Sequence, residues 1–290
     1  MITILGVYLY ILVGFISKKI FKKIDAKTLV LLSTYFLQPF LTLWGILLIP
    51  LNKDLILSPL TYLIAVFISF VITFSISFVL KDKKDRIISS IAPLIGNTGN
   101  LGIPLSYALF GDIGASVATI INLANVFFIY TFVIFFYASG EYSFKESLKK
   151  IIKIPIIWFG ILALILNILG IKFSVDIMKI LQMGAFASIV VQLLIFGIYV
   201  AEIKFREVNM KLSILVLVNK FIVLPFLTLL TLHFFHLNPI IKQVILLEVL
   251  TPLAVTNVNL AALFNMYPEK VAFLVIVTSV VFIGVSMIFI

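Results

Sequence analysis

Long stretches without a charged side chain dominate this sequence of 290 residues. Eight of them contain no Asp, Glu, Lys or Arg, and they cover residues 1–17, 28–52, 55–80, 87–111, 113–140, 154–171, 180–201 and 271–290. Two further windows, 212–241 and 243–268, are apolar except for Lys220 and Glu248, respectively. About 20 apolar residues in a helix cross the hydrocarbon core of a bilayer. The sequence therefore predicts an all-α polytopic membrane protein with ten transmembrane helices.

The composition excludes a soluble globular fold. Hydrophobic residues make up 63% of the chain and charged residues 12%, whereas a soluble domain carries about 25% charged residues. Ten spans of about 20 residues each occupy about 200 residues, so no room is left for a separate soluble domain. The chain has no cysteine, which excludes disulfides, thiolate metal sites and a cysteine nucleophile. We expect neither a metal nor a cofactor.

The basic residues indicate the orientation of the chain in the membrane. The formal net charge is +10, but the lysines and arginines lie between the apolar runs and form no single patch, so we expect no nucleic-acid partner. Seventeen of the 22 lie in alternate loops, four lie in the other loops, and Lys220 lies inside a span. Basic residues accumulate in cytoplasmic loops. This bias predicts that both termini face outward, with the first apolar segment retained in the protein.

A basic loop at the centre of the sequence, residues 139–153, divides the chain into two halves. We expect a first five-helix repeat over residues 1–140, a cytoplasmic linker over 141–153 and a second five-helix repeat over 154–290. An odd number of spans in each half gives the halves opposite orientations. Inverted repeats of this kind recur in secondary transporters, whose binding sites form near the midplane where interrupted helices meet.

The fourth and ninth spans carry residues that interrupt a helix. The fourth contains L-I-G-N-T-G-N-L-G-I-P-L-S over residues 94–106, and the ninth contains L-T-P-L-A-V-T-N-V-N-L over 250–260. Glycine and proline disfavour a continuous helix, and freed backbone groups at membrane depth are tolerated only against protein or a wet cavity. We therefore expect both breaks to line a site. The residues assigned to the breaks are Gly96, Gly99, Gly102, Pro104 and Pro252.

Polar residues beside the breaks predict an anion site. Each break starts a second half-helix near the bilayer centre, and the positive ends of two such half-helices would converge there. Neutral donors nearby favour a carboxylate as the substrate group; they are Asn97, Thr98, Asn100, Thr256 and Asn257. The structural alternative is that these side chains only cap the broken helices. Asn122 and Asn125 on the fifth span are a secondary pair, with hydrogen bonding between helices as the alternative.

Two charged residues lie inside the predicted spans, Lys220 in the eighth and Glu248 in the ninth. An isolated charge at mid-membrane costs about 2.5–3.5 kcal/mol on insertion scales, so we expect the two to meet or to face water. In the structural interpretation they form an ion pair that fixes the two spans together. In the functional interpretation Glu248 binds a coupling H⁺ or Na⁺. The Lys220 ammonium then either competes for that cation position or occupies it permanently, and permanent occupation would leave the carrier uncoupled from Na⁺.

The segment G-N-T-G-N-L-G-I-P-L over residues 96–105 resembles the auxin efflux carrier family, as do Pro252 and A-A-L-F-N-M-Y-P over residues 261–268. This family includes plant auxin exporters and bacterial carriers described as malate or malonate permeases. The resemblance extends over the whole chain. It implies the crossed-helix fold shared with bile acid sodium symporters, in which spans four and nine cross at the midplane, here beside Pro104 and Pro252.

The resemblance also implies roles for single residues. Asn97 falls where plant members of the family place an asparagine on the substrate carboxylate. Glu248 and Val249 are similar to a glutamate-valine pair whose glutamate ligates sodium in the symporters, and this sequence departs from that pattern by carrying Lys220. Family members often form homodimers through the scaffold side, and the sequence leaves the oligomeric state open. The implied location is the plasma membrane of a bacterium or archaeon.

Taken together, the sequence predicts a secondary active transporter of small organic anions that resemble malate, malonate or auxin. Its expected partners are this anion and the lipid bilayer. Alternating access would follow an elevator scheme, with spans one, two, six and seven as scaffold and spans three to five and eight to ten as transport core. The alternatives are an uncoupled anion uniporter or channel and a membrane sensor without transport. An enzyme is not expected, because Glu248 is the only carboxylate inside the spans and the metalloprotease motif H-E-x-x-H is absent.

Overall fold

The computed structural model describes residues 2–137, 155–202 and 209–286, and the regular structure of this part of the chain is helical. The predicted linker, residues 141–153, lies outside the described residues. The elements before it are α1 (Ile2–Ile20), α2 (Ala26–Leu32), η1 (Ser33–Leu37), α3 (Gln38–Leu47), α4 (Lys53–Ser77), α5 (Lys83–Ile91), η2 (Ala92–Leu94), η3 (Thr98–Gly102), α6 (Ile103–Phe128), η4 (Ile129–Val133) and α7 (Ile134–Tyr137). Those after it are α9 (Pro155–Ile168), α10 (Val175–Glu202), α11 (Met210–Val218), η5 (Asn219–Val223), α12 (Leu224–Phe234), α13 (Pro239–Leu250), α14 (Thr256–Leu263) and α15 (Pro268–Ser286).

Six helical stretches in the described part of the chain are long and apolar enough to cross a membrane. They are Thr28–Leu47, Lys53–Ser77, Thr98–Tyr137, Val175–Ala201, Met210–Phe234 and Pro268–Ser286. The structure therefore has the character of a polytopic membrane protein. The count differs from ten partly because the predicted ninth span is divided between α13 and α14 and because Thr98–Tyr137 joins two predicted spans in one stretch of 40 residues. The ten-span arrangement stays a prediction.

The helices begin in two different ways. Four of them start behind an Asn or Asp whose side chain accepts a hydrogen bond from a backbone N–H of the first turn; these residues are Asn52, Asp82, Asn209 and Asn238. Such caps satisfy amides that have no partner inside the helix. The residues that precede η3 and α14, Asn97 and Val255, make no such side-chain bond. At the start of η3 the amides of residues 98–100 have no protein acceptor in the described chain, whereas at the start of α14 the Asn257 and Val258 amides donate to the carbonyls of residues 254 and 255.

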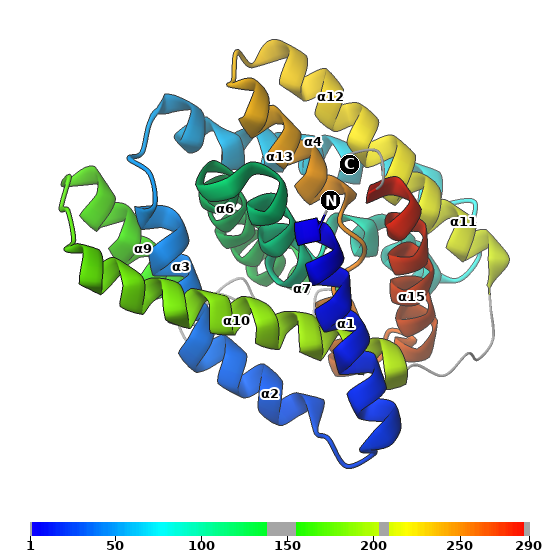
Figure 1. Cartoon of the computed structure of the whole chain (residues 1–290). Coiled ribbons are helices and arrows are strands. Elements are labelled where there is room, and N and C mark those ends of the chain that lie inside the picture. Colours follow the sequence, from blue (N-terminus) through cyan, green and yellow to red (C-terminus); the bar gives the residue numbers. More distant parts are fainter. Residues whose placement is uncertain (1, 138–154, 203–208, 287–290) are drawn as a thin grey trace.

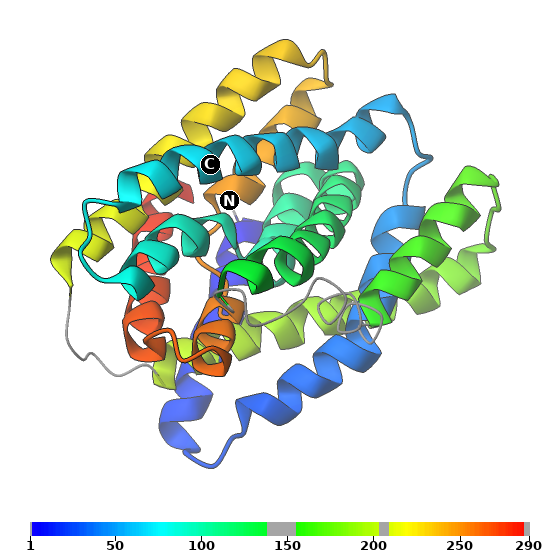
Figure 2. The same ribbon diagram turned by 180° about the vertical axis from the view of Figure 1, so that it is seen from behind.

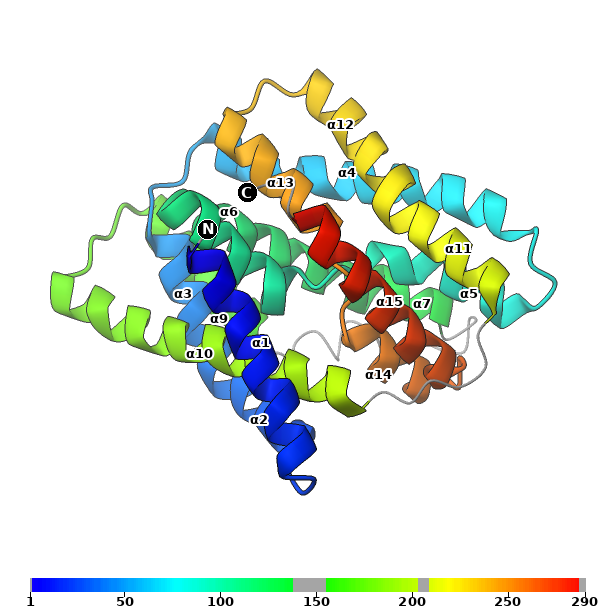
Figure 3. The same ribbon diagram turned by 45° about the vertical axis from the view of Figure 1, so that its right-hand side comes forward.

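The helices pack in two groups. One group holds α1, α2, α3, α9 and α10, with α1 lying along α10 and α3 packed on both α9 and α10 (Figure 1). The other holds α4, α5 and α11 to α15, with α12 packed on α4 and α13 on α6. Helix α6 lies between the groups and contacts α1, α3 and α9 of the first and α4 and α13 of the second (Figure 3).

Helix α6 is interrupted by a kink at Gly111. Gly111, within its span, has φ 60° and ψ −143°, which is not helical. Only glycine adopts this region readily. The chain therefore reverses at Gly111, and the half-helix that begins at Thr98 is followed at once by a second helical segment that ends at Tyr137 (Figure 2).

Candidate functional site

Two interrupted helices cross at the centre of the molecule. Between η2 and η3 the chain is extended at Gly96, and between α13 and α14 it is extended at Leu253, and these two residues form an antiparallel bridge. The Asn97 amide donates to the Pro252 carbonyl at 2.8 Å, and the Ala254 amide donates to the Ile95 carbonyl at 2.9 Å. Both breaks thus satisfy part of each other's freed backbone, as a site buried in protein requires.

Asn257 fastens this crossing. Its side-chain nitrogen donates to the Ile95 carbonyl and to the Ala254 carbonyl, each at 3.0 Å, and the residue is fully buried. Asn257 was expected to bind substrate, but it does not line the cavity described next. Its contacts are those of a residue that holds two chain segments together.

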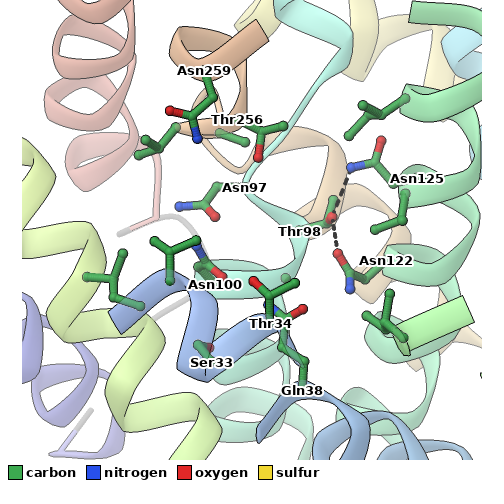
Figure 4. A pocket seen from close by; sticks show the side chains of 18 of the residues that line it. Ser33, Thr34, Gln38, Asn97, Thr98, Asn100, Asn122, Asn125, Thr256 and Asn259 are labelled. Atoms are coloured by element: carbon green, nitrogen blue, oxygen red, sulfur yellow. Dashed lines mark hydrogen bonds between the residues drawn. The ribbon is translucent and has the colours of Figure 1, made fainter. Parts of the chain in front are cut away.

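A cavity of about 170 Å³ lies beside the crossing (Figure 4). Four groups of polar side chains face it: Asn97, Thr98 and Asn100 from the first break, Thr256 and Asn259 from α14, Asn122 and Asn125 from α6, and Ser33, Thr34 and Gln38 from the α2–α3 region. Apolar side chains complete the wall, among them Val30, Val126, Ile129, Ile156 and Ile195. Among the residues that the structure describes, no Asp, Glu, Lys or Arg lines the cavity.

Two side chains of this wall, Ser33 and Asn97, have a buried polar atom without a partner in the described chain, and of the two Asn97 belongs to the crossing. Asn97 is 3% exposed, and its buried Nδ2 has no hydrogen-bond acceptor among the residues that the structure describes. An unpartnered buried amide costs about 1–3 kcal/mol, so the position calls for a ligand or an ordered water. The backbone amides of Thr98, Gly99 and Asn100, which start the same half-helix, also have no protein acceptor in the described chain.

Thr98 and the pair on the fifth predicted span are bound to one another. The Thr98 hydroxyl donates to Asn122 Oδ1 at 2.9 Å and accepts from Asn125 Nδ2 at 3.0 Å. Asn125 Oδ1 accepts in turn from the Tyr62 hydroxyl at 3.3 Å. These contacts favour the structural interpretation for Asn125 and for the Thr98 side chain. Asn122 Nδ2 has no acceptor in the described chain and can face a ligand.

The glycines assigned to the breaks matter because they lack a side chain, more than because they allow unusual backbone angles. A methyl group on Gly99 would lie 2.9 Å from Asn122 Oδ1, and one on Gly102 would lie 2.6 Å from Glu248 Cδ. None of Gly96, Gly99 and Gly102 has a positive φ. These glycines therefore make room for polar side chains of neighbouring helices.

The two prolines have different positions. Pro252 lies in the second break, and its carbonyl accepts the Asn97 amide. Pro104 was expected to interrupt the fourth span, but it lies in the first turn of α6. A proline is tolerated there because its missing N–H is one that the helix would not use. Pro93, in η2, lies closer to the interruption.

Glu248 and Lys220 are both buried at the crossing, but they do not form a direct ion pair. Glu248 is 0% and Lys220 1% exposed. Glu248 Oε1 accepts from the Ser106 hydroxyl at 3.0 Å, while Oε2 has no partner in the described chain. A direct ion pair is present elsewhere, between Lys270 and Asp85 at 2.9 Å. We expected the two charges to meet or to face water; the described chain shows no direct ion pair between them, although both lie against the same crossing.

Sequence reasoning missed several residues of the cavity wall. Asn259 lies three residues after Thr256, and residues at this spacing share one face of a helix, whereas Asn257 points to another face. Applying that rule to the ninth span would have chosen Asn259 in place of Asn257. Ser33 and Thr34 carry no comparable signal, because the second predicted span reads as an ordinary apolar run with scattered hydroxyl residues.

Comparison with known proteins agrees with this architecture. A model of the family described as membrane transport protein matches residues 1–290, the whole chain. The chain is also 26% identical, over 290 residues, to an uncharacterized transporter of Methanocaldococcus jannaschii, and the match covers 96% of this chain and 93% of that relative. The family is one of transporters and not of enzymes. The chain therefore belongs to the membrane transport protein family, the family of the auxin efflux carriers, and it is a membrane transporter.

Proposed function

We propose that this protein is a secondary active transporter of small organic anions, with a carboxylate bound beside the helix crossing. The observation that carries the proposal is the buried, unpartnered Nδ2 of Asn97 at the start of an uncapped half-helix. Thr256 begins a second uncapped half-helix on the same cavity wall. Helix N-termini carry about half a positive elementary charge each and bind anions through their free amides.

The neutral cavity supports an anion in preference to a cation. A cation would need carboxylates or several carbonyls as ligands, and no acidic side chain lines the wall. Donors dominate near the crossing, namely Asn97 Nδ2 and the amides of residues 98–100. The apolar residues opposite them fit the hydrocarbon part of a small organic acid. The class is therefore carboxylates of the malate, malonate or auxin type.

We further propose that transport follows alternating access of the elevator type. The helices would form ten spans in two inverted five-helix repeats, with both termini outside. The two packing groups support a division into a scaffold of α1, α2, α3, α9 and α10 and a transport core of the remaining described helices. The crossing lies in the second group, so the anion would move with that group. The alternative is an uncoupled uniporter, which the buried Lys220 favours.

The proposal is tested by uptake of labelled malate and of a panel of short mono- and dicarboxylates into proteoliposomes. Gradients of pH or Na⁺ are imposed in separate runs. We expect saturable uptake of at least one acid, competed by its close analogues. Uptake that follows one gradient identifies a coupled carrier, and uptake indifferent to both identifies a uniporter. A lack of uptake of every acid by folded protein would exclude this substrate class, and discrete single-channel openings in electrical recordings would exclude a carrier.

A further inference from the structure

Two residues of opposite charge are buried at the helix crossing, outside the wall of the anion cavity. Lys220 and Glu248 come from η5 and α13, and neither lines the anion cavity. Both are buried to at least 99%, and no direct ion pair joins them in the described chain. A buried charge that forms no direct pair needs some other compensation. The surroundings of the two side chains show where that compensation comes from.

Three polar atoms surround one point beside Gly96. A methyl group built on Gly96 would lie 3.1 Å from Lys220 Nζ, 2.7 Å from the Thr251 hydroxyl and 3.4 Å from the Glu248 carbonyl. The ammonium thus lies against the first break, next to oxygens of the second. A larger residue at position 96 would displace it. The sequence of the break therefore leaves space for the lysine head.

The first halves of the crossing helices end at this place. Before the first break the helical chain ends with η2 at Leu94, and before the second break it ends with α13 at Leu250. Two helical C-termini therefore meet near Gly96. Such ends carry about half a negative elementary charge each, and a cation near them is stabilising. The Glu248 carboxylate adds a further negative group. The crossing is negative on this side, whereas the cavity side presents the positive N-terminal ends of the second halves.

We propose that Lys220 is a tethered cation, which permanently fills a binding position for one monovalent cation at the crossing. Removing its ammonium opens that position to a small cation from solution. Oxygen atoms are available, because the Thr251 hydroxyl and the Glu248 carbonyl lie around the point beside Gly96. In addition, Glu248 Oε2 and the Oδ1 of Asn219, the residue before Lys220, are buried without a partner in the described chain. The inference deepens the proposed function by assigning the cation of the crossing to the chain itself, so that transport needs no sodium.

The test is chemical rescue of Lys220→Ala, measured by thermal unfolding of the purified full-length protein in detergent. Each variant is melted in choline chloride and, at equal ionic strength, in ethylammonium, methylammonium or sodium chloride. A ligand at about 100 times its Kd raises the melting temperature of a chain of this size by several degrees. We expect ethylammonium, methylammonium or Na⁺ to raise the melting temperature of Lys220→Ala by about 3 °C or more over choline. The wild type should melt at the same temperature in all four salts.

Two variants control this measurement. Lys270→Ala also removes a lysine, but at the partly exposed ion pair with Asp85, and it should gain nothing from small cations. Lys220→Ala with Glu248→Gln removes the negative partner, and we expect the rescue to disappear. If Lys220→Ala does not survive purification, Lys220→Met, which keeps the length of the side chain, takes its place, and the binding of radiolabelled Na⁺ to the wild type is measured directly.

The proposal is overturned if a folded variant at position 220 gains no stability from any of the three cations. It is also overturned if the wild type binds Na⁺ or is stabilised by it over choline, because the position would then not be occupied by the lysine. No transported acid enters these experiments. A failure to find carboxylate uptake would therefore reject the proposed function and leave this result standing, and the reverse also holds.

Discussion

Three asparagines at the crossing differ only in how completely their side chains are bound. Asn257 donates two hydrogen bonds to backbone carbonyls, and Asn125 is bound through both its nitrogen and its oxygen. Asn97 has no partner for its nitrogen in the described chain. Residue type and spacing alone could not separate them. Asn257 Oδ1 is also buried without a partner in the described chain, but Asn257 does not line the cavity. A free donor nitrogen on the cavity wall, which only the structure reveals, supports Asn97 as the proposed ligand residue.

The first prediction contrasts Asn97→Ala with Asn257→Ala. Asn97→Ala should leave the melting temperature nearly unchanged and raise the KM for the transported acid about 10-fold or more, because a hydrogen bond to a charged group contributes about 1.5–3 kcal/mol. Asn257→Ala should lower the free energy of unfolding by about 1–3 kcal/mol, because it leaves buried carbonyls at Ile95 and Ala254 short of a donor. Uptake kinetics and thermal unfolding measure the two effects. An unchanged KM in Asn97→Ala for every transported acid would remove this residue from the site.

The second prediction concerns Gly102. Its missing side chain leaves the space taken by the Glu248 carboxylate, so Gly102→Ala should destabilise the protein by about 1–3 kcal/mol through overpacking. Gly284→Ala is the matched control, because a methyl group there meets nothing within 4 Å and alanine favours a helix. Melting temperatures of the two variants are compared. Equal stability would mean that the carboxylate moves aside at no cost.

Among the elements, α6 depends most on a single residue. The bend at Gly111 connects the half-helix before it directly to the next span, without a loop between the two. The sequence places an acidic residue, Asp112, between two apolar runs at this point, which indicates a loop but not its tightness. When a single residue with positive φ reverses the chain, the glycine at that position is the only sign of the reversal in the sequence.

The third prediction is therefore Gly111→Ala. No atom lies within 4 Å of the added methyl group, so steric overlap with neighbours plays no part and only backbone strain remains. At φ 60° and ψ −143°, this strain should cost about 1–3 kcal/mol of stability. Denaturation of the variant and of Gly6→Ala, whose added methyl also meets no atom within 4 Å, measures the difference. If both variants are as stable as the wild type, the bend tolerates a side chain.

The sequence predicts the two interruptions well, because several glycine, proline and asparagine residues close together in an apolar run disfavour a continuous spanning helix. It does not predict their exact limits. Pro93 and Pro104 both flank the first break, and the rule that proline disrupts a helix does not tell which one lies at the interruption and which one starts the next helix. The sequence also does not predict the π-helical turns η1, η3, η4 and η5, because one extra residue in a turn leaves no trace in the composition.

At the scale of the whole molecule, the two packing groups meet along α6. Because the chain has no cysteine, pairs of cysteines can be introduced across this boundary without competing disulfides from native residues. A Cβ atom on Gly45 of α3 would lie 2.9 Å from Thr119 Cβ of α6, across the boundary. One on Gly184 of α10 would lie 2.7 Å from Phe40 Cβ of α3, within the first group. Both separations are about 1 Å shorter than in an ordinary disulfide, so the two pairs need a similar small adjustment.

The fourth prediction uses these pairs. An oxidised Gly45→Cys, Thr119→Cys variant should lose uptake and regain it on reduction, because the link joins the proposed scaffold to the proposed transport core. The Gly184→Cys, Phe40→Cys variant should form its link and keep transporting. Mobility shifts on gels report cross-linking, and uptake in the same proteoliposomes reports function. Full uptake by the first variant while cross-linked would exclude a sliding movement between the two groups.

The cavity wall without charged side chains has a consequence for the electrical properties of the carrier. The empty site brings no charge of its own, and the two charges at the crossing cancel. A bound monoanion therefore gives the loaded carrier one net negative charge, while the empty carrier returns with none. Each cycle of the proposed carrier, when it moves no coupling cation, then moves current, and a membrane potential of 100 mV, negative inside, adds about 2.3 kcal/mol per charge in the outward direction. Voltage alone would make such a carrier an exporter.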